Sequence, residues 1–168
     1  MTSKQKLELT WLGKDKEIKL EPRILIEDKE KSNCENDSNT ENMIIHGDNL
    51  LALKALEQKY SGQVKCIYID PPYNTGSAFE HYDDNLEHST WLSLMRSRLK
   101  ILKGLLSEEG AIFIQIDDEE YAYLKVLCDE IFGEKNKLGV LTIINNLKGR
   151  SDDNFFATCN EYLLVYSK

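Results

Sequence analysis

Apolar residues along the chain form short continuous runs that alternate with runs of helical spacing. Val64–Ile69 has the length and β-branched composition of a buried strand, and Ala111–Ile116 has the same character. Between them, apolar residues recur at steps of three and four positions, as on one face of a helix. These residues are Leu92, Met95, Leu99, Leu102 and Leu106. A strand, a helix and a second strand in this order predict a right-handed parallel crossover.

Shorter patterns flank this central unit. Residues 43–46 are predicted to form a short strand that ends at the turn Gly47-Asp48, and a helix follows from Leu50. After the second long strand, the pattern predicts a helix that ends near Gly133 and then two strands, at residues 140–144 and 162–166. The sequence therefore predicts an α/β chain.

The first 42 residues differ in composition from the rest, and we interpret them as an N-terminal arm and polar linker before a domain at residues 43–168. Residues 27–42 are rich in acid, Asn and Ser, so they cannot bury a core and are expected to form a mobile linker. The preceding stretch offers apolar side chains that could dock the arm. These are Trp11, Leu12, Ile24 and Leu25.

The strand Val64–Ile69 stops at Asp70-Pro71-Pro72-Tyr73 because two successive prolines remove two backbone donors and fix the backbone. In an α/β sheet, the carboxyl edge of a strand is where ligands bind. Asp70 and the carbonyl of Pro71 could each accept an N–H of an aromatic amine such as adenine N6, while Tyr73 stacks on a flipped base. The alternative is a Pro-rich turn that only closes the strand.

The motif has a wider setting. IYIDPPYNTG follows IIHGDNLLALKAL and precedes WLSLMRSRLKILKGLLSEEGAIFIQIDDEEYAYLKVLCDEIFG. Together these segments closely resemble the amino-methylating DNA methyltransferases, and most of all the adenine-N6 class typified by modification subunits of type III restriction systems. The resemblance covers about Leu7–Lys168. It implies part of a Rossmann-like fold, with S-adenosylmethionine as methyl donor, DNA as substrate and the last two strands as an antiparallel hairpin.

The resemblance also implies roles for particular residues. Asp70, Pro71 and Tyr73 would be catalytic, and Pro72 and Asn74 would bind substrate. By the same resemblance Asp48 would lie near the adenosine of the donor, although a helix N-cap explains it equally. Residues 74–88 are either a lid over the target base or an ordinary connection.

Other acidic and histidine residues have simpler explanations. Asp117 could line the same cleft as Asp70, but capping of the following helix by Asp117 with Glu120 is the safer interpretation. His81 and His88 lack a companion for a metal site, and methyl transfer needs no metal. No metal site is therefore predicted.

Composition restricts the picture further. The chain has 168 residues, a hydrophobic content of 41% and a formal charge of −8, which argues mildly against a grip on DNA by this chain alone. A basic cluster on the predicted helix is interpreted as a solvated face; it consists of Arg96, Arg98, Lys100 and Lys103. Four scattered cysteines suggest neither zinc nor disulfides, and we expect Cys66 and Cys128 in the core. Without a membrane-length apolar run or signal peptide, we expect a cytoplasmic protein.

One feature of the family is missing. No Gly-rich cofactor loop of the form F-x-G-x-G occurs, and seven glycines along the folded part are isolated. We expect the chain to be the N-terminal catalytic part of a methyltransferase whose sheet is incomplete here, so that alone it binds donor weakly and methylates little. A complementary segment or a restriction subunit would be its partner. The alternatives are a non-catalytic assembly module and a cytosine-N4 methyltransferase.

Overall fold

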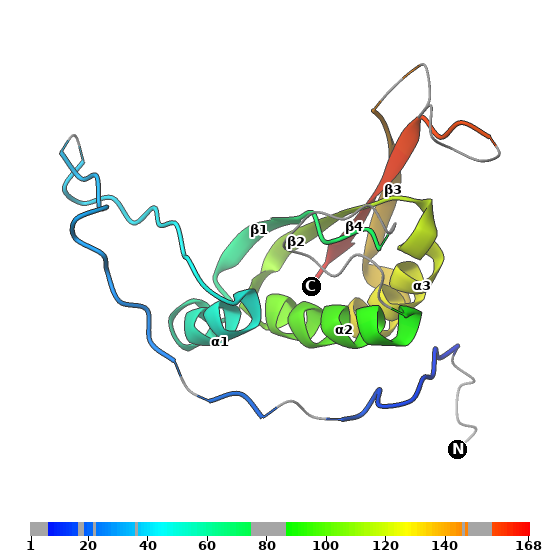
Figure 1. Cartoon of the computed structure of the whole chain (residues 1–168), viewed down its shortest axis with the longest axis horizontal. Helices are drawn as coiled ribbons and strands as arrows, with labels where there is room; N and C mark the ends of the chain where they lie inside the picture. Colours follow the sequence, from blue (N-terminus) through cyan, green and yellow to red (C-terminus); the bar gives the residue numbers. More distant parts are fainter. Residues whose placement is uncertain are drawn as a thin grey trace.

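The computed structural model of the chain describes residues 7–16, 19–21, 23–35, 37–74, 87–145, 147 and 156–168. The elements in order are α1 (Asn49–Tyr60), β1 (Val64–Ile69), α2 (His88–Leu105), β2 (Leu106–Ile116), α3 (Asp118–Cys128), the π-helical turn η1 (Asp129–Gly133), the 3₁₀ turn η2 (Glu134–Asn136), β3 (Lys137–Ile144) and β4 (Asn160–Ser167). Figure 1 shows the chain coloured along its sequence.

The strands of the described residues form a sheet in the order β1-β2-β4-β3. β1 and β2 are parallel and are joined by α2, as the sequence predicted. β4 runs antiparallel to both β2 and β3, so the expected terminal hairpin is confirmed. The chain is therefore α/β, with a parallel unit followed by an antiparallel hairpin.

The core lies between the sheet and the three helices, which cover one face of it (Figure 1). β2 contributes Ile112, Ile114 and Ile116, all fully buried. From α2 come the buried residues Trp91, Leu92, Met95, Leu99 and Leu102. Each such side chain contributes about 1.5–3 kcal/mol when fully buried, so this helix–sheet contact is the main source of stability. Among the described helices, none combines the length and apolarity needed to cross a bilayer.

β2 begins at Leu106, five residues before the predicted start, because the chain passes directly from α2 into the sheet. Its pairing with β1 shifts register between Val64 and Cys66. Gly110 lies at this shift, where a Cβ atom would come 2.7 Å from the carbonyl oxygen of Val64. The two backbones approach too closely there for any side chain, which explains the glycine.

The opposite face of the sheet is less covered in the described part of the chain. Tyr68 is 56% exposed, and Leu141 and Cys66 are also exposed. The prediction that Cys66 is a core thiol is wrong, because alternate residues of a strand face opposite sides and only the side of Ile67 meets the helices. Cys128 is fully buried as predicted, and burial raises the pKa of its thiol.

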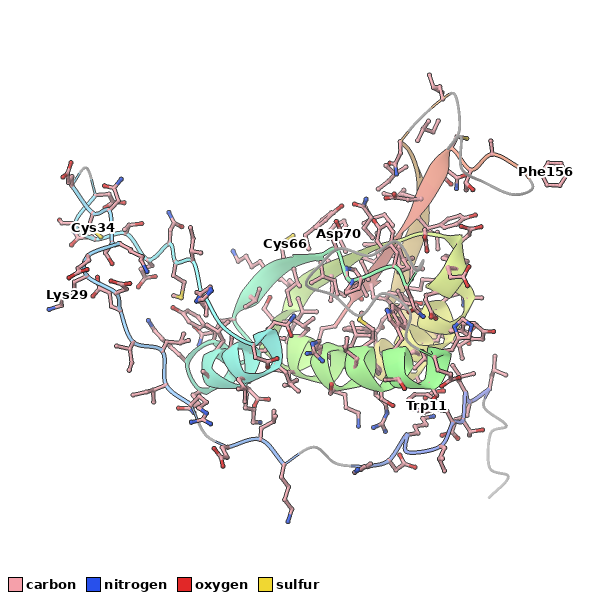
Figure 2. The ribbon with its side chains drawn as sticks, viewed as in Figure 1. Trp11, Lys29, Cys34, Cys66, Asp70 and Phe156 are labelled. Atoms are coloured by element: carbon pink, nitrogen blue, oxygen red, sulfur yellow. The ribbon has the colours of Figure 1, made fainter. Side chains whose placement is uncertain are left out.

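The N-terminal arm docks through only one of the four residues predicted. Leu9 and Trp11 pack against the core, and the indole Nε1 of Trp11 donates to Ser93 Oγ at 2.7 Å. Leu12 is 97% exposed, and Ile24 and Leu25 are exposed as well, so the prediction holds for Trp11 alone. Figure 2 shows Trp11 on the arm, next to the helical layer. Apolar character alone therefore did not select the docked segment.

The strand predicted at residues 43–46 is absent. These residues are extended but pair with no strand in the described part of the chain, and Ile44 lies entirely in solvent. An apolar run becomes a strand only where a neighbour accepts its backbone hydrogen bonds. β1, at the end of the sheet, has no second neighbour among the described strands.

Candidate active site

The Asp70–Asn74 motif lies at the edge of the sheet where β1 and β2 end. Because β4 runs antiparallel to β2, the start of β4 lies at this same edge. Figure 2 shows Asp70 there, just beyond the end of β1. The edge gathers acids from three segments that are distant in sequence. They are Asp70 after β1, Asp117 and Glu120 at the start of α3, and Glu161 in β4.

Tyr73 reaches across the sheet edge to β4. Its hydroxyl donates to Glu161 Oε2 at 2.9 Å, and the same oxygen accepts from Gln115 Nε2 at 2.5 Å. Gln115 in turn accepts from the hydroxyl of Tyr68. Burial, followed by the neighbouring carboxylates of Asp70 and Glu161, raises the pKa of Tyr73 well above its usual range. Tyr73 is therefore a neutral phenol whose ring is fixed at its outer end.

The two prolines differ in how their carbonyl groups are used. The buried Trp91 donates from Nε1 to the carbonyl oxygen of Pro72 at 2.8 Å. Among the residues that the structure describes, no donor contacts the carbonyl of Pro71. Asp70 is exposed. The Asp70 carboxylate lies beside the Tyr73 hydroxyl, and the Pro71 carbonyl has no donor among the described residues. The amine-accepting role that the sequence suggests for this pair stays a prediction.

Asn74 ends the motif in a left-handed backbone conformation, with a φ of 63° that Asn tolerates better than most residues. Its Nδ2 donates to Glu120 Oε1 at 2.6 Å, and His88 Nδ1 lies 2.8 Å from the same oxygen. Glu120 has no exposed surface. The lid predicted between residues 74 and 88 falls on positions 75–86, outside the described residues.

Asp48 and Asp117, for which the sequence allowed either a ligand-binding or a capping role, both cap helices. Asp48 Oδ1 accepts from the backbone N–H of Leu51 at 3.0 Å and caps α1. Asp117 Oδ1 accepts from the N–H of Glu119 at 3.2 Å and caps α3. The capping interpretations are confirmed, while the donor-binding role of Asp48 stays a prediction.

Four residues that hold the motif were not predicted from the sequence, and they are His88, Trp91, Glu120 and Glu161. Glu120 carried a usable signal, because it stands four and seven positions before Leu124 and Leu127 on the apolar face of α3. An acid at a core position needs a partner. Glu161 gives a weaker signal of the same kind, as an acid near the start of a strand whose following residues are mostly apolar or aromatic.

The basic residues of α2 are largely committed within the chain. Arg96 pairs with Asp15 at 3.2 Å, Arg98 Nε donates to Asn49 at 2.7 Å, and Lys103 Nζ donates to a backbone carbonyl at 2.6 Å. The interpretation as a solvated face is therefore incomplete, because three of these four side chains also make contacts within the chain. Lys148 and Arg150, in a later loop that the sequence leaves open as either DNA-approaching or an ordinary solvent loop, lie outside the described residues.

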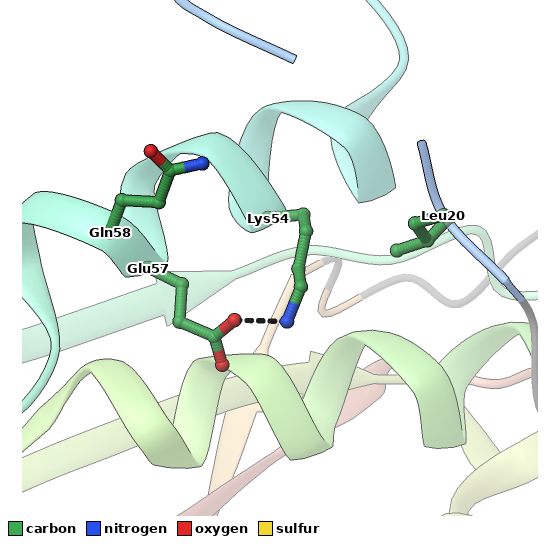
Figure 3. Close-up of a pocket in the computed structure, with 4 residues that line it drawn as sticks. All are labelled: Leu20, Lys54, Glu57 and Gln58. Carbon is green, nitrogen blue, oxygen red and sulfur yellow. Dashed lines mark hydrogen bonds and ion pairs between the residues drawn. The ribbon is translucent and has the colours of Figure 1, made fainter. Parts of the chain in front are cut away.

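A hollow on α1 is separate from the motif (Figure 3). It is lined by Leu20, Lys54, Glu57 and Gln58. Lys54 and Glu57 form an ion pair three residues apart on the helix surface, an arrangement that contributes little to stability and suggests no chemistry. The motif edge is the better candidate because acceptors, an aromatic ring and buried acids meet there.

Solved structures with the same fold are DNA-modifying enzymes. A proposed DNA modification methylase of Thermus thermophilus, complexed with S-adenosyl-L-methionine, matches with a TM-score of 0.52 at 18% identity, over 70% of this chain and 50% of that chain. The cytosine-N4-specific PvuII DNA methyltransferase matches with a TM-score of 0.51 at 14% identity, over 69% and 46%. At such low identity these matches show the fold, which is part of a Rossmann-like methyltransferase sheet.

Sequence relatives are considerably more similar. The EcoPI Mod subunit of Escherichia phage P1, a type III restriction-modification enzyme, is 38% identical over 99% of this chain. The EcoP15I Mod subunit of Escherichia coli is 37% identical over the same share. The HindVI Mod subunit of Haemophilus influenzae, named as a probable type III enzyme, is 47% identical over 76%. This chain spans 31%, 31% and 18% of the lengths of these three relatives.

A family description also matches. Residues 64–168, from the start of β1 through the last strand, match the DNA methylase family N6_N4_Mtase. The matched region contains the motif and every residue that holds it. The resemblance stated from the sequence is thereby confirmed, and the chain belongs to the DNA methylase family.

Proposed function

We propose that this chain supplies the amine-holding side of an active site that transfers a methyl group from S-adenosylmethionine to an exocyclic amino group of a DNA base. Adenine N6 is the acceptor we favour, on the strength of the Mod-subunit relatives. The carrying observation is the acceptor pair at the end of β1. Trp91 occupies the carbonyl of Pro72, whereas the Asp70 carboxylate is exposed and the Pro71 carbonyl accepts nothing from the described residues.

This pair fits the chemical difficulty of the reaction. The lone pair of an aromatic amine is delocalised into the ring, which makes the nitrogen a poor nucleophile. Two acceptors that hold its two hydrogens favour a pyramidal nitrogen with the lone pair free for attack. Asp70 then accepts the proton that the methylated amine loses, or passes it to water, so it need not be a strong base.

Tyr73 fits the binding of an extrahelical base. Its hydroxyl is held by the buried Glu161, so the ring is restrained without any contribution from substrate. Stacking on such a ring contributes about 1–3 kcal/mol per base. That is comparable to the few kcal/mol needed to unstack a nucleotide from a duplex. Pro72 and Asn74, on either side of Tyr73, would complete the substrate side.

The acidic edge fits the charge of the donor. S-adenosylmethionine supplies a methyl group whose bond to a positively charged sulfur breaks, with the electron pair going to sulfur, as the amine nitrogen forms its new bond. Four acids at one edge favour such a cation and disfavour the phosphates of DNA. DNA phosphates would therefore lie elsewhere. Asp48 remains our candidate for the adenosine side.

The chain is much shorter than its relatives, so the proposal includes further chains or segments. The chain spans less than a third of each of the three Mod-subunit relatives, so we propose that a complementary methyltransferase segment contributes donor binding and sequence recognition. A restriction subunit is a further candidate partner. We expect the reaction in the cytoplasm, together with its DNA substrate.

Methyl transfer from labelled S-adenosylmethionine to DNA tests the proposal. The chain is assayed alone and after fusion to the part of the EcoPI Mod subunit outside the match. We expect little transfer alone and clear transfer by the fusion, with N6-methyladenine found by nucleoside mass analysis. N4-methylcytosine would reassign the acceptor. A folded fusion that binds donor and DNA but transfers nothing would favour the non-catalytic assembly role.

A further inference from the structure

Glu120 is a buried acid that its own helix does not use. It is the third residue of α3, the position from which a capping-box acid bonds back to the N-cap backbone. Its hydrogen bonds go instead to Asn74 and His88, both at Oε1. Its second oxygen, Oε2, is buried without a partner among the described residues. Such an atom costs about 1–3 kcal/mol, so the acid requires an explanation beyond helix capping.

The two partners of Glu120 give the explanation. Asn74 directly follows Tyr73, and His88 begins α2 on the other side of the undescribed residues 75–86. One turn of α2 later, Trp91 holds the carbonyl of Pro72. The motif is thus held at Pro72 by α2 and at Asn74 by α3, with Tyr73 between the two contacts. Asn74 needs such support because its backbone is left-handed.

We propose that Glu120 is a positioning residue of the active site, which acts on the motif through Asn74 and His88 and does not itself contact substrate. The carboxylate fixes the end of the motif, so that Asp70 and the Pro71 carbonyl point at one amine. The effect on catalysis rests on the function proposed above. The contacts of Glu120 with Asn74 and His88 do not rest on that function, because they can be measured in this chain without any methyl transfer.

The geometry makes a spectroscopic prediction. Oε1 accepts from Asn74 and lies 2.8 Å from His88 Nδ1. An ionised Glu120 has only acceptors, so Nδ1 then carries the shared hydrogen, and a neutral His88 is held as the Nδ1–H tautomer with Nε2 as the bare nitrogen. The ring of Tyr123, with its centroid 4.9 Å away, supports this orientation. An unrestrained histidine would populate both tautomers.

Nitrogen-15 NMR of the chain tests the clamp directly. In the wild type we expect a single Nδ1–H tautomer for His88 and a distinct, slowly exchanging side-chain amide for Asn74. E120A should release both signals, whereas E120Q, which keeps an acceptor oxygen, should retain the Asn74 signal. Glu119, exposed on the same turn, provides the control E119A, which should change neither. Circular dichroism checks folding, and N74A offers a second route if E120A does not fold, since it should alter His88 only slightly.

Kinetics in the fusion described above tests the catalytic consequence. A misplacement of about 1 Å costs on the order of 10²-fold in rate, so we expect E120A to lower kcat by about that factor. The KM for donor should stay within about twofold, and E120Q should recover part of the loss.

The outcomes separate this proposal from the proposed function. Unchanged His88 and Asn74 signals in a folded E120A chain would overturn the clamp, whatever the fusion does. Altered signals with an unchanged kcat would overturn its catalytic role. Altered signals in the chain, together with a wild-type fusion that transfers nothing, would support the clamp and count against the function instead.

Discussion

Glu120 and Glu130 stand ten residues apart on one helical stretch, and the structure uses them in different ways. Both are largely buried, and both hold a segment that is distant in sequence. Glu130 accepts from the backbone N–H of Leu9 at 2.6 Å with one oxygen and from Lys14 Nζ at 2.8 Å with the other. Glu120 contacts both Asn74 and His88 with one oxygen and leaves the other unpaired among the described residues.

This difference suggests different roles: Glu130 stabilises the fold, whereas Glu120 supports the motif. At Glu130 both oxygens are satisfied and the charge is balanced by Lys14, which also donates to the carbonyl of Leu9 at 2.6 Å. This arrangement docks the arm and contacts no motif residue in the described part of the chain. At Glu120 the charge is poorly satisfied, yet it meets the motif. Proteins tolerate such costs mainly at functional sites.

The largest effect is expected at the motif. D70A removes one of two acceptors for the amine, and loss of one preorganised hydrogen-bonding group in an active site costs about 10²–10³ in rate. Asp70 is exposed, so the melting temperature should change little. Methyl transfer by the fusion, measured beside thermal unfolding, checks both parts. Retained turnover would count against the assignment of Asp70.

The next largest effect concerns the N-terminal arm and is opposite in kind to that of D70A. The free energy of unfolding should fall, while methyl transfer by the fusion should be retained. E130A leaves Lys14 and the N–H of Leu9 without their shared partner, and we expect unfolding to become easier by about 2–3 kcal/mol. This is at the low end for a broken pair because solvent reaches part of it. Urea denaturation measures the change, with the exposed Glu134 as control in E134A. Equal losses of unfolding free energy in E130A and E134A would contradict the stabilising role assigned to Glu130.

A smaller effect isolates the second anchor of the arm. S93A removes the acceptor of the Trp11 indole, and a single neutral hydrogen bond contributes about 1 kcal/mol. Trp11 fluorescence should shift as the indole loses its partner, and the unfolding midpoint should fall slightly. An unchanged emission spectrum would show that the arm is not docked in solution as it is here.

The smallest effect is a pH dependence of the ion pair between Lys14 and Glu130. Burial alone would lower the pKa of Lys14, but the hydrogen bonds that its ammonium donates to Glu130 and Glu8 outweigh it and raise the pKa above its usual 10.5. The contribution of Lys14 to stability is therefore complete at neutral pH and is lost as the pH rises above 10.5. Comparing wild type with K14M over that range removes the effect of tyrosine ionisation. A difference between them that already declines well below that range would contradict the direction of the shift.

Local patterns predicted the elements because each depends on nearby residues. The apolar spacing of α2, the caps at Asp48 and Asp117, and the strand that stops at Asp70 can all be recognised within a few positions. The parallel crossover follows from their order. The terminal hairpin came from the family resemblance rather than from spacing, which cannot give the pairing of β3 with β4.

Contacts between distant segments could not be predicted in the same way. Tyr73 meets Glu161 across 88 positions, and Lys14 meets Glu130 across 116. Nothing near Lys14 marks it as buried, whereas Leu12 and Ile24 looked suitable and are exposed. An apolar pattern also failed at residues 43–46 and at Cys66, because burial depends on whether another element covers the position. The sequence therefore indicated where the motif lies at the sheet edge, but not the distant side chains that hold it.

Titration of the chain with S-adenosylmethionine by calorimetry, alone and then in the fusion, tests the central claim most directly. The claim is that this chain holds the amine and that residues outside it complete the donor site. We predict weak or undetectable binding by the 168-residue chain and clear stoichiometric binding by the fusion. Tight stoichiometric binding by the chain alone would contradict the claim and identify the chain as sufficient for donor binding.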